Sequence, residues 1–241
     1  MNTSNFNYDK KRIIVPLDVS SKDDAFALLD QLDSELCRVK VGKQLFTSCG
    51  PTLVADIIKR GYDVFLDLKF HDIPNTVAQA VEAAADLGVW MVNVHASGGR
   101  AMLEAASKRV ASRSGPRPLL IGVTVLTSLS KDDLLEVGLD ESPEVLVKRL
   151  ALLSADCGLD GVVCSAGETP LLRQVLPEGF HLVTPGIRRP SDARNDQKRV
   201  TGPAEAIQSG SSYLVVGRPI TEAESPREAL REFNNAVAGV I

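Results

Sequence analysis

Residues 65–77 read FLDLKFHDIPNTV, an apolar, strand-like run that acquires charged side chains before it ends. Asp67, Lys69 and Asp72 follow directly on the apolar residues 64–66. A charged group resists transfer from water into a protein core, so charges in such a place persist where they are paired or used in chemistry. We therefore interpret this stretch both as a strand and as a candidate functional site.

Similar short apolar runs, rich in β-branched residues, recur along the whole chain. There are eight of them: 13–19, 36–42, 63–69, 90–96, 119–126, 161–166, 181–187 and 213–218. Nearly continuous apolar character is typical of parallel strands whose outer face is covered by helices. The runs therefore predict eight parallel strands.

The segments between these runs have features of helix starts and helix ends. In residues 21–32 apolar side chains recur at helical spacing, and Ser21 with Asp24 resembles a capping box. Residues 130–138 predict a short additional helix after the fifth strand. Proline, which loses no hydrogen bond in a first helical turn, stands at five expected helix starts: Pro51, Pro143, Pro170, Pro203 and Pro226. Glycine, which suits a left-handed helix stop, follows four expected helices: Gly61, Gly88, Gly158 and Gly210.

Eight strand–helix units in 241 residues predict a (β/α)8, or TIM, barrel, whose usual length is about 250 residues. The main alternative is a doubly wound open sheet, which usually has a glycine-rich phosphate-binding turn after its first strand. The sequence VPLDVSSKDD at 15–24 contains no such turn. Because no linker or shift in composition divides the chain, we expect a polar tail over 1–12 and one catalytic barrel domain over 13–241.

The composition excludes several classes of partner. The chain is mildly acidic, with 27 Lys and Arg against 31 Asp and Glu, and it has no basic block of the kind that binds nucleic acid or anionic membranes. Its four cysteines match no zinc-binding spacing and are expected to be free thiols: Cys37, Cys49, Cys157 and Cys164. The N-terminus lacks the apolar stretch of a signal peptide, and no run approaches the length of a membrane span. These features predict a cytoplasmic protein.

Polar residues gather at the carboxyl ends of the expected strands, which is where barrel enzymes carry out their chemistry. Because side chains alternate along a strand, Asp67 and Lys69 are expected to point to the same face. Lys40 and Asp18, on the two preceding strands, can share that face. We expect the carboxylates to keep Lys69 as an ammonium group. The set is either a structural ion-pair network or a catalytic cluster, and its place at the strand ends favours the catalytic interpretation.

The ends of the seventh and eighth strands form a second candidate site. Loops after these strands frequently bind phosphate in barrel enzymes. Gly217 allows close approach of an anion, and Arg218 can bind phosphate through two hydrogen bonds. The segment 186–201 is long and polar, so it is either a solvated surface loop or a lid. Its place beside Gly217 and Arg218 favours a lid that closes over an anion. His71 and His95 are expected to pack or hydrogen-bond, because no third imidazole stands at a useful strand end for metal binding.

These blocks together resemble the orotidine 5′-phosphate decarboxylase family, whose members form UMP in pyrimidine nucleotide synthesis. The similarity covers residues 13–235, and FLDLKFHDIPNTV resembles the characteristic block of the family. Six other blocks match in the expected order: LDV (17–19), RVKVGKQLF (38–46), VNVHASGG (92–99), VTVLTS (123–128), TPGIR (184–188) and VVGRP (215–219). The resemblance implies a homodimer that decarboxylates orotidine 5′-phosphate to UMP without a metal or cofactor.

The resemblance also implies roles for individual residues. Lys69 would donate a proton to C6 of the pyrimidine, and Asp67 would lie beside the substrate carboxylate. Lys40 would bridge the carboxylates and the ribose, and Asp72 would enter the active site of the partner subunit. The other substrate-binding residues implied are Asp18 at the ribose, Thr76 at the ribose across the subunit interface, Ile73, Thr127 at the pyrimidine, Gln197 between base and phosphate, and Arg188, Gly217 and Arg218 at the phosphate.

Two other classes of protein fit parts of this pattern. Metal-dependent lyases that act on sugar phosphates, such as hexulose-phosphate synthases, have a similar D-x-K-x-x-D strand. They need a divalent ion, so full activity in excess chelator would distinguish the two. The second class is a catalytically silent phosphate-binding barrel. A mere binder gains little from removing acids and lysines from water, so the charged cluster counts against this alternative.

Overall fold

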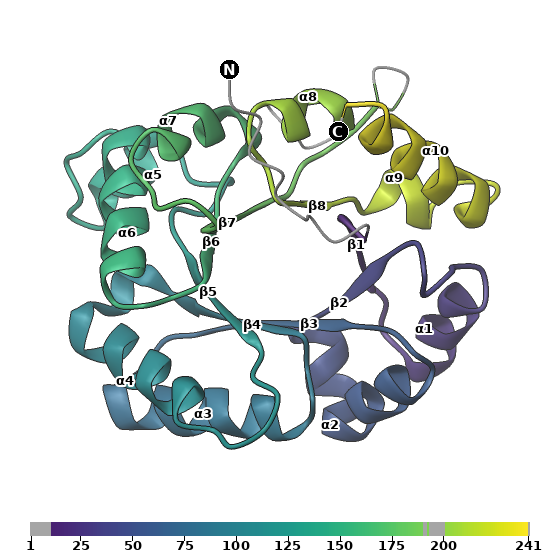
Figure 1. Cartoon of the computed structure of the whole chain (residues 1–241), viewed down its shortest axis with the longest axis horizontal. Helices are drawn as coiled ribbons and strands as arrows, with labels where there is room; N and C mark the ends of the chain where they lie inside the picture. Colours follow the sequence, from purple (N-terminus) through teal and green to yellow (C-terminus); the bar gives the residue numbers. More distant parts are fainter. Residues whose placement is uncertain (1–10, 190–191, 193–200, 241) are drawn as a thin grey trace.

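The computed structural model describes residues 11–189, 192 and 201–240. It contains the predicted barrel, in which eight parallel strands pair in sequence order and the last strand closes the ring on the first (Figure 1). The strands are β1 (Ile13–Pro16), β2 (Arg38–Gly42), β3 (Val64–Phe70), β4 (Met91–His95), β5 (Leu119–Val123), β6 (Gly161–Val163), β7 (His181–Thr184) and β8 (Tyr213–Val215). A closed ring excludes the alternative of an open doubly wound sheet.

The helices lie outside the ring of strands (Figure 1). They are α1 (Lys22–Leu29), α2 (Lys43–Lys59), α3 (Pro74–Asp86), α4 (Arg100–Ala111), α5 (Lys131–Glu136), α6 (Pro143–Asp156), α7 (Thr169–Arg173), α8 (Pro203–Gln208), α9 (Arg218–Thr221) and α10 (Pro226–Ala238), with 3-10 turns η1 (Ala96–Gly98) and η2 (Ala166–Glu168). The additional helix predicted after the fifth strand is α5. Ser130 and Asp133 form a capping box at its start, because each side chain accepts a hydrogen bond from the backbone amide of the other.

Proline begins helices at the positions that the sequence predicts. Pro143, Pro203 and Pro226 occupy the first turns of α6, α8 and α10. Pro51 lies within α2, directly after Gly50, whose φ of 69° interrupts the helical geometry. Pro51 therefore begins the second half of a kinked helix, where its missing amide hydrogen leaves no hydrogen bond unmade.

The paired strands are shorter than the apolar runs that predict them. The run at 119–126 pairs only as far as Val123, and the run at 161–166 only as far as Val163. Beyond β5, Val125 still lines a cavity at the barrel mouth. Apolar character extends past the last hydrogen-bonded pair because these residues remain packed, so it does not reveal where a strand ends.

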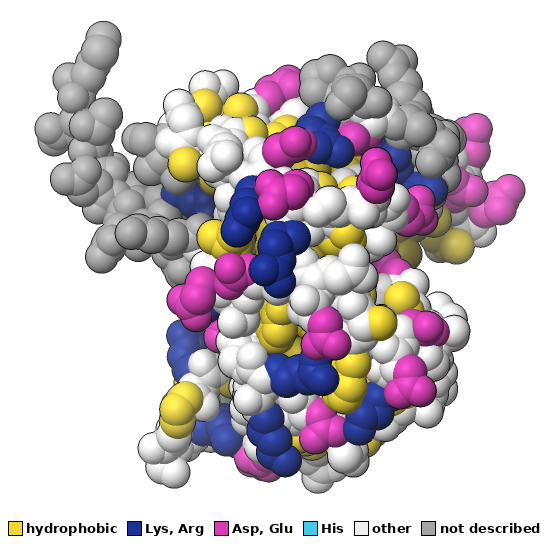
Figure 2. Space-filling model, turned by 90° about the vertical axis from the view of Figure 1, so that its right-hand side faces the viewer, with side chains coloured by type: hydrophobic (Ala, Val, Ile, Leu, Met, Phe, Trp, Pro, Cys, Tyr) yellow, Lys and Arg dark blue, Asp and Glu magenta, His cyan; other side chains and the backbone are white. Residues whose placement is uncertain are grey.

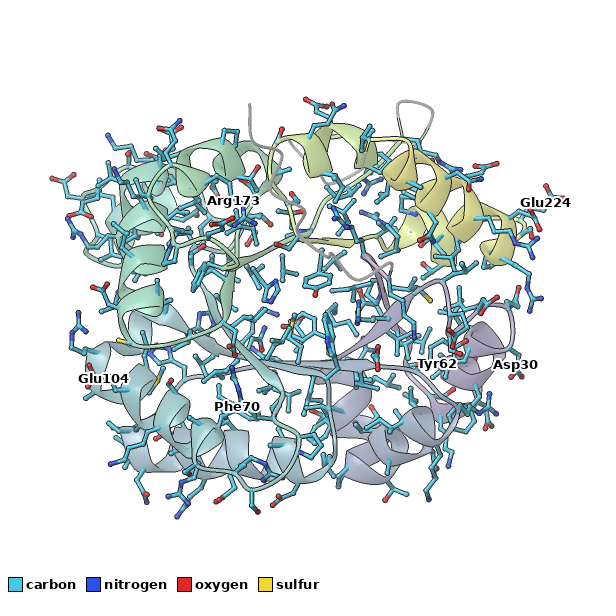
Figure 3. All side chains as sticks on the ribbon, viewed as in Figure 1. Asp30, Tyr62, Phe70, Glu104, Arg173 and Glu224 are labelled. Carbon is cyan, nitrogen blue, oxygen red and sulfur yellow. The ribbon has the colours of Figure 1, made fainter. Side chains whose placement is uncertain are left out.

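Apolar side chains fill the inside of the barrel (Figure 3). The interior layer comes from six different strands: Ile14, Phe65, Met91, Ile121, Val183 and Tyr213. At the amino ends of the strands, the Arg38 guanidinium lies 4.0 Å from the centre of the Trp90 ring, a favourable cation–π contact. The barrel is therefore a packed core rather than a channel, and it leaves the opposite, carboxyl end for a ligand.

A larger apolar cluster lies between the strands and the surrounding helices. In α2, Leu53, Val54 and Ile57 are almost completely buried and belong to this cluster. Full burial of each such side chain contributes about 2 kcal/mol to folding. In Figure 3 the labelled Tyr62 lies at this outer layer, where its hydroxyl donates a 2.9 Å hydrogen bond to the carbonyl of Leu29. This outer layer holds the helices against the barrel and so fixes the strand ends that carry the polar residues.

One backbone hydrogen bond of the barrel lies just before β1. Arg12, which the prediction places in the polar tail, is only 4% exposed. Its carbonyl accepts a 2.9 Å hydrogen bond from the amide of Leu214, which continues the pairing of β1 with β8. Backbone pairing thus reaches a charged residue that hydropathy assigns to solvent, while the division into a tail over 1–12 and a barrel domain over 13–241 stays a prediction.

The cysteines behave as predicted. All four lie in the described part of the chain and are free, with Cys37, Cys157 and Cys164 buried and Cys49 half-buried. Burial raises the pKa of the Cys37 thiol to about 12. The thiol is therefore neutral at physiological pH and packs as a small apolar side chain.

The surface carries charges of both signs. Lys and Arg side chains are interspersed with Asp and Glu over the face drawn in Figure 2. Within the described ranges, no helix combines the length and the apolar character needed to cross a bilayer.

Candidate active site

A chain of alternating charges crosses the carboxyl ends of the first three strands. The Nζ of Lys69 lies 2.5 Å from Oδ1 of Asp67, and the Nζ of Lys40 lies 3.3 Å from Oδ2 of the same carboxylate. Lys40 also lies 3.3 Å from Oδ1 of Asp18. The four residues that the sequence places on one face are therefore brought together, and that prediction is confirmed.

Asp67 is the centre of this network and is only 8% exposed. Burial by itself would raise the pKa of its carboxyl, because it disfavours the charged form. The positive charges of Lys40 and Lys69, together with hydrogen bonds from Lys69 and Asn93, outweigh burial and lower the pKa of Asp67. Asp67 is therefore a carboxylate at neutral pH, held between two ammonium groups.

Strand β3 is irregular where it carries these charges. Between the pairs Leu66–Val92 and Phe70–Val94, β3 has three residues and β4 has one, so the strand bulges. Lys69, at the end of the bulge, has φ of 54°, and no other non-glycine residue in the described ranges has positive φ. Such a backbone costs about 1–3 kcal/mol. Asp67 and Lys69 both line cavities at the barrel mouth, whereas Leu68 and Phe70 pack against the outer apolar cluster. The predicted alternation of side chains is therefore confirmed, and the irregularity lies in the backbone pairing with β4.

Two cavities open beside the charges, and Lys40, Asp67 and Lys69 line both of them. The first, of about 180 Å³, is lined about equally by polar and apolar surface and extends toward Asp18 and Lys43. The second, of about 200 Å³, is mainly apolar. Its other lining residues are Phe65, Val123, Val125, Leu126, Thr127, Val163, Cys164, Val183, Pro185 and Val215. An apolar compartment with an ammonium group at its edge suits a flat ring that develops negative charge.

The second predicted site, at β7 and β8, is present in part. Arg188, after β7, is 5% exposed, and its amide donates a 3.2 Å hydrogen bond to the carbonyl of Thr201. Gly217 and Arg218 follow β8, where Arg218 begins α9. Because β7 and β8 are neighbours, these residues share one sector of the barrel mouth. Gln197 and most of the predicted lid lie outside the described residues.

The loop after β3 and the first turn of α3 carry three predicted site residues that do not join the two cavities of their own chain. Asp72, Ile73 and Thr76 are exposed, and Ile73 is 67% exposed. Oδ1 of Asp72 accepts a 2.6 Å hydrogen bond from the amide of Ile73. None of the three is among the described residues that line the two cavities. The two cavities of one chain therefore do not include these residues, and the role of Asp72 and Thr76 in a partner's site stays a prediction.

The two histidines near the mouth lie against each other, with the ring centres of His71 and His95 5.5 Å apart. Burial lowers the pKa of His95, and its electrostatic interactions with His71, Lys43 and Lys69 lower that pKa further. Within the part of the chain that the structure describes, no three His, Cys, Asp or Glu side chains cluster as metal ligands do.

The prediction omitted one residue of the network. Asn93, in β4, is completely buried and donates from Nδ2 to Oδ1 of Asp67 at 2.7 Å. Its place at a strand end is visible in the sequence, but its hydrogen-bond partner on the neighbouring strand β3 is not. The apolar floor of the second cavity was also omitted, because an apolar residue in a strand gives no sign of whether it faces a ligand or a helix.

Comparison with known proteins agrees with this geometry. Residues 11–233 match the model of the "Orotidine 5′-phosphate decarboxylase / HUMPS family". A protein of Nitrosomonas europaea named orotidine 5′-phosphate decarboxylase is 59% identical over 230 residues, which are 95% of this chain and 98% of that protein. One of Pseudomonas aeruginosa with the same name is 56% identical over 218 residues, which are 90% of this chain and 94% of that protein.

A solved structure is similar over the same length. The crystal structure of orotidine 5′-phosphate decarboxylase from Lactobacillus acidophilus has a TM-score of 0.84 and 36% sequence identity, covering 94% of this chain and 99% of that one. The sequence resemblance is thereby confirmed: the chain is an enzyme that belongs to the orotidine 5′-phosphate decarboxylase / HUMPS family.

Proposed function

We propose that this enzyme converts orotidine 5′-phosphate into UMP and carbon dioxide. The observation that carries the proposal is the ammonium group of Lys69, which lies 2.5 Å from the buried carboxylate of Asp67 and lines a mainly apolar cavity. The names of the relatives support the same substrate.

The chemistry requires a fixed positive charge. Breaking the C6–carboxylate bond leaves an electron pair in the plane of the pyrimidine ring, where no adjacent carbonyl delocalises it. Lys69 stabilises that pair and then transfers a proton to C6, so that the products are UMP and CO2. Because its charge interacts more strongly with the developing carbanion than with the substrate, it lowers the barrier rather than only strengthening binding.

The neighbouring charges hold and tune this lysine. Asp67 lies beside the substrate carboxylate and repels it as it leaves. Lys40, paired with both Asp67 and Asp18, bridges the acids and the ribose, and Asp18 binds ribose hydroxyls. The support for these roles is the order of the charges at the mouth, in which each acid contacts a base. In this mechanism the charges of the protein supply all of the stabilisation, and neither a metal nor a cofactor takes part.

The phosphate is bound far from the reacting carbon. Arg188, Gly217 and Arg218 surround the end of β7 and β8 and bind it, with Gln197 linking phosphate and base. Thr127 lines the apolar cavity, where it contacts the pyrimidine. Binding energy from the phosphate holds the ring against Lys69. In enzymes generally, such positioning lowers the activation barrier by about 7 kcal/mol or more.

A homodimer completes the active site. Asp72 and Thr76, with Ile73 between them, reach the substrate bound to the partner subunit. The support for this arrangement is the exposure of all three residues on one chain and their absence from the described lining of its cavities.

The test is turnover of orotidine 5′-phosphate by the purified protein, followed by its loss of absorbance and by formation of UMP, with and without excess chelator. We expect turnover in both conditions, and a fall of at least about 1,000-fold in kcat/KM for Lys69→Ala. Lys59→Ala, at a side chain that is 79% exposed, is the matched control and should retain wild-type turnover. Loss of activity in chelator would favour a metal-dependent lyase, and near-normal turnover by Lys69→Ala would refute the mechanism.

A further inference from the structure

Asn93 occupies the position in β4 that faces the bulge of β3. It is completely buried. Its Oδ1 accepts a 2.8 Å hydrogen bond from the backbone amide of Lys69, and its Nδ2 donates to Oδ1 of Asp67. One side chain thus binds the backbone of one charged residue of the network and the carboxylate of another.

The bulge explains why this side chain is needed. Between the pairs Leu66–Val92 and Phe70–Val94, three β3 residues face Asn93 alone, so the main chain of β4 cannot pair with all of them. The amide of Lys69 would be left without a backbone partner, in a conformation that L-residues rarely adopt. The side chain of Asn93 supplies the missing acceptor, and that hydrogen bond holds Lys69 at positive φ.

Only a carboxamide serves both partners at neutral charge. The amide of Lys69 requires an acceptor, and the carboxylate of Asp67 requires a donor, and a primary amide carries one of each on the same carbon. The opposite orientation of the amide would set its NH2 against an N–H group and its oxygen against a carboxylate, so the partners determine the orientation. Aspartate would set a second negative charge against Asp67, and leucine, of similar size, would satisfy neither partner.

We propose that Asn93 is a positioning residue for the decarboxylation proposed above, one that sets the place of the Lys69 ammonium against Asp67 by holding the bulge of β3. The inference rests on that proposed function. Asn93 does not occur among the described residues that line either cavity, so it acts through Lys69 and Asp67 rather than on the substrate. Its contribution therefore belongs to the chemical step and not to substrate binding.

The first test is Asn93→Leu, with kcat and KM measured separately. We expect kcat to fall about 100-fold, as a misplacement of about 1 Å does in other active sites, and KM to stay within about twofold. Ser212→Ala is the matched control, because Oγ of this buried serine accepts a 3.0 Å hydrogen bond from the amide of Leu182 at the far, amino end of the barrel. Thermal melting should show both variants folded. An equal fall of kcat in both variants, or an unchanged kcat in Asn93→Leu, would overturn the proposal.

The second test is the pH profile of Asn93→Asp. Two carboxylates that share a site hold one proton between them, with one pKa raised well above the ordinary value of about 3.9. With that proton present, the pair has the charge of the wild type and can form the same two hydrogen bonds. The ratio of variant to wild-type kcat should therefore rise at least about tenfold from pH 9 to pH 5. The same ratio for Asn93→Leu should be flat, and a flat ratio for Asn93→Asp would count against the positioning role.

A crystal structure of Asn93→Leu separates failure of this inference from failure of the proposed function. Displacement of the Lys69 Nζ from Asp67, or loss of positive φ at residue 69, supports the positioning role even if the wild type does not decarboxylate orotidine 5′-phosphate. An unchanged Lys69 in a wild-type-like bulge overturns the inference even if the wild type is active.

Discussion

At the scale of single residues, Asp67 decides how the charges of the site coexist. Its carboxylate receives Lys69 and Asn93 on Oδ1 and Lys40 on Oδ2. A buried carboxylate without these partners would destabilise the fold, and so would two half-buried ammonium groups without a carboxylate. The site is stable as a set, and its members are not independent.

This coupling predicts how stability responds to acid. The pKa of Asp67 is lower in the folded protein than in the unfolded chain, so its contribution is complete above about pH 4, the ordinary value, and is lost as pH falls through the lower folded value. At pH 7 we expect Asp67→Asn to lower the free energy of unfolding by about 3 kcal/mol, so that the variant unfolds at a lower urea concentration than the wild type. The difference from wild type should shrink from pH 4 to pH 2.5.

The control for this experiment is Asp86→Asn. Asp86 pairs with Arg113 at 2.6 Å, but its side chain is 65% exposed, and surface pairs contribute about 0–1 kcal/mol. Urea midpoints of this variant should follow those of the wild type at each pH. A difference between Asp67→Asn and wild type that stays constant down to pH 2.5 would contradict the assigned pKa direction.

At the scale of elements, the barrel requires close approach between neighbouring strands. Gly161, the first residue of β6, pairs with His181 at the start of β7. A methyl group on residue 161 would lie 2.8 Å from Cβ of His181 and nearer still to its carbonyl oxygen. Backbone atoms cannot rotate away as the end of a side chain can, so only glycine fits this position without a shift of the strand.

We therefore expect Gly161→Ala to destabilise the protein by about 1–3 kcal/mol, the usual range for overpacking. Gly167→Ala, in η2, is the matched control, because a methyl group there would meet no atom within 4 Å. Its stability should stay within about 1 kcal/mol of wild type. Chemical denaturation of the three proteins measures both effects, and equal stability of the two variants would show that β6 can shift to make room.

At the scale of the whole molecule, the barrel mouth of one chain does not gather every proposed site residue among the described residues. Asp72, on the loop after β3, and Thr76, in the first turn of α3, are exposed and lie outside the described lining of both cavities of their own chain. The proposed dimer places them in the site of the other subunit. Activity then depends on assembly, because each barrel supplies its lysine and acid network but receives an acid from its partner.

Mixed dimers test this directly. If Asp72→Asn and Lys69→Ala chains are unfolded together and reassembled at equal concentration, half of the dimers are mixed and each has one intact site. Activity should therefore return to about a quarter of wild type. A mixture of Asp67→Asn with Lys69→Ala is the control, because both residues belong to the same barrel and no mixed dimer has an intact site. Equal recovery in both mixtures, or none in the first despite proven mixed dimers, would contradict the shared site.

The sequence by itself determined the repeating plan of this protein. Eight apolar runs, helix-starting prolines such as Pro143, and polar residues at strand ends were enough to predict the barrel and to place Asp18, Lys40, Asp67 and Lys69 at its mouth. These features are local, because the side-chain period of a strand or helix and the backbone limits of proline act within a few residues.

Only the tertiary structure decided how those residues meet. The bulge at β3, the positive φ of Lys69 and the two hydrogen bonds of Asn93 all depend on pairing between β3 and β4. The strand ends and the apolar floor of the cavity depend on which neighbours close the ring. Such features are set by hydrogen bonds and packing between segments far apart in the chain, and no local pattern of residues records where those segments come together.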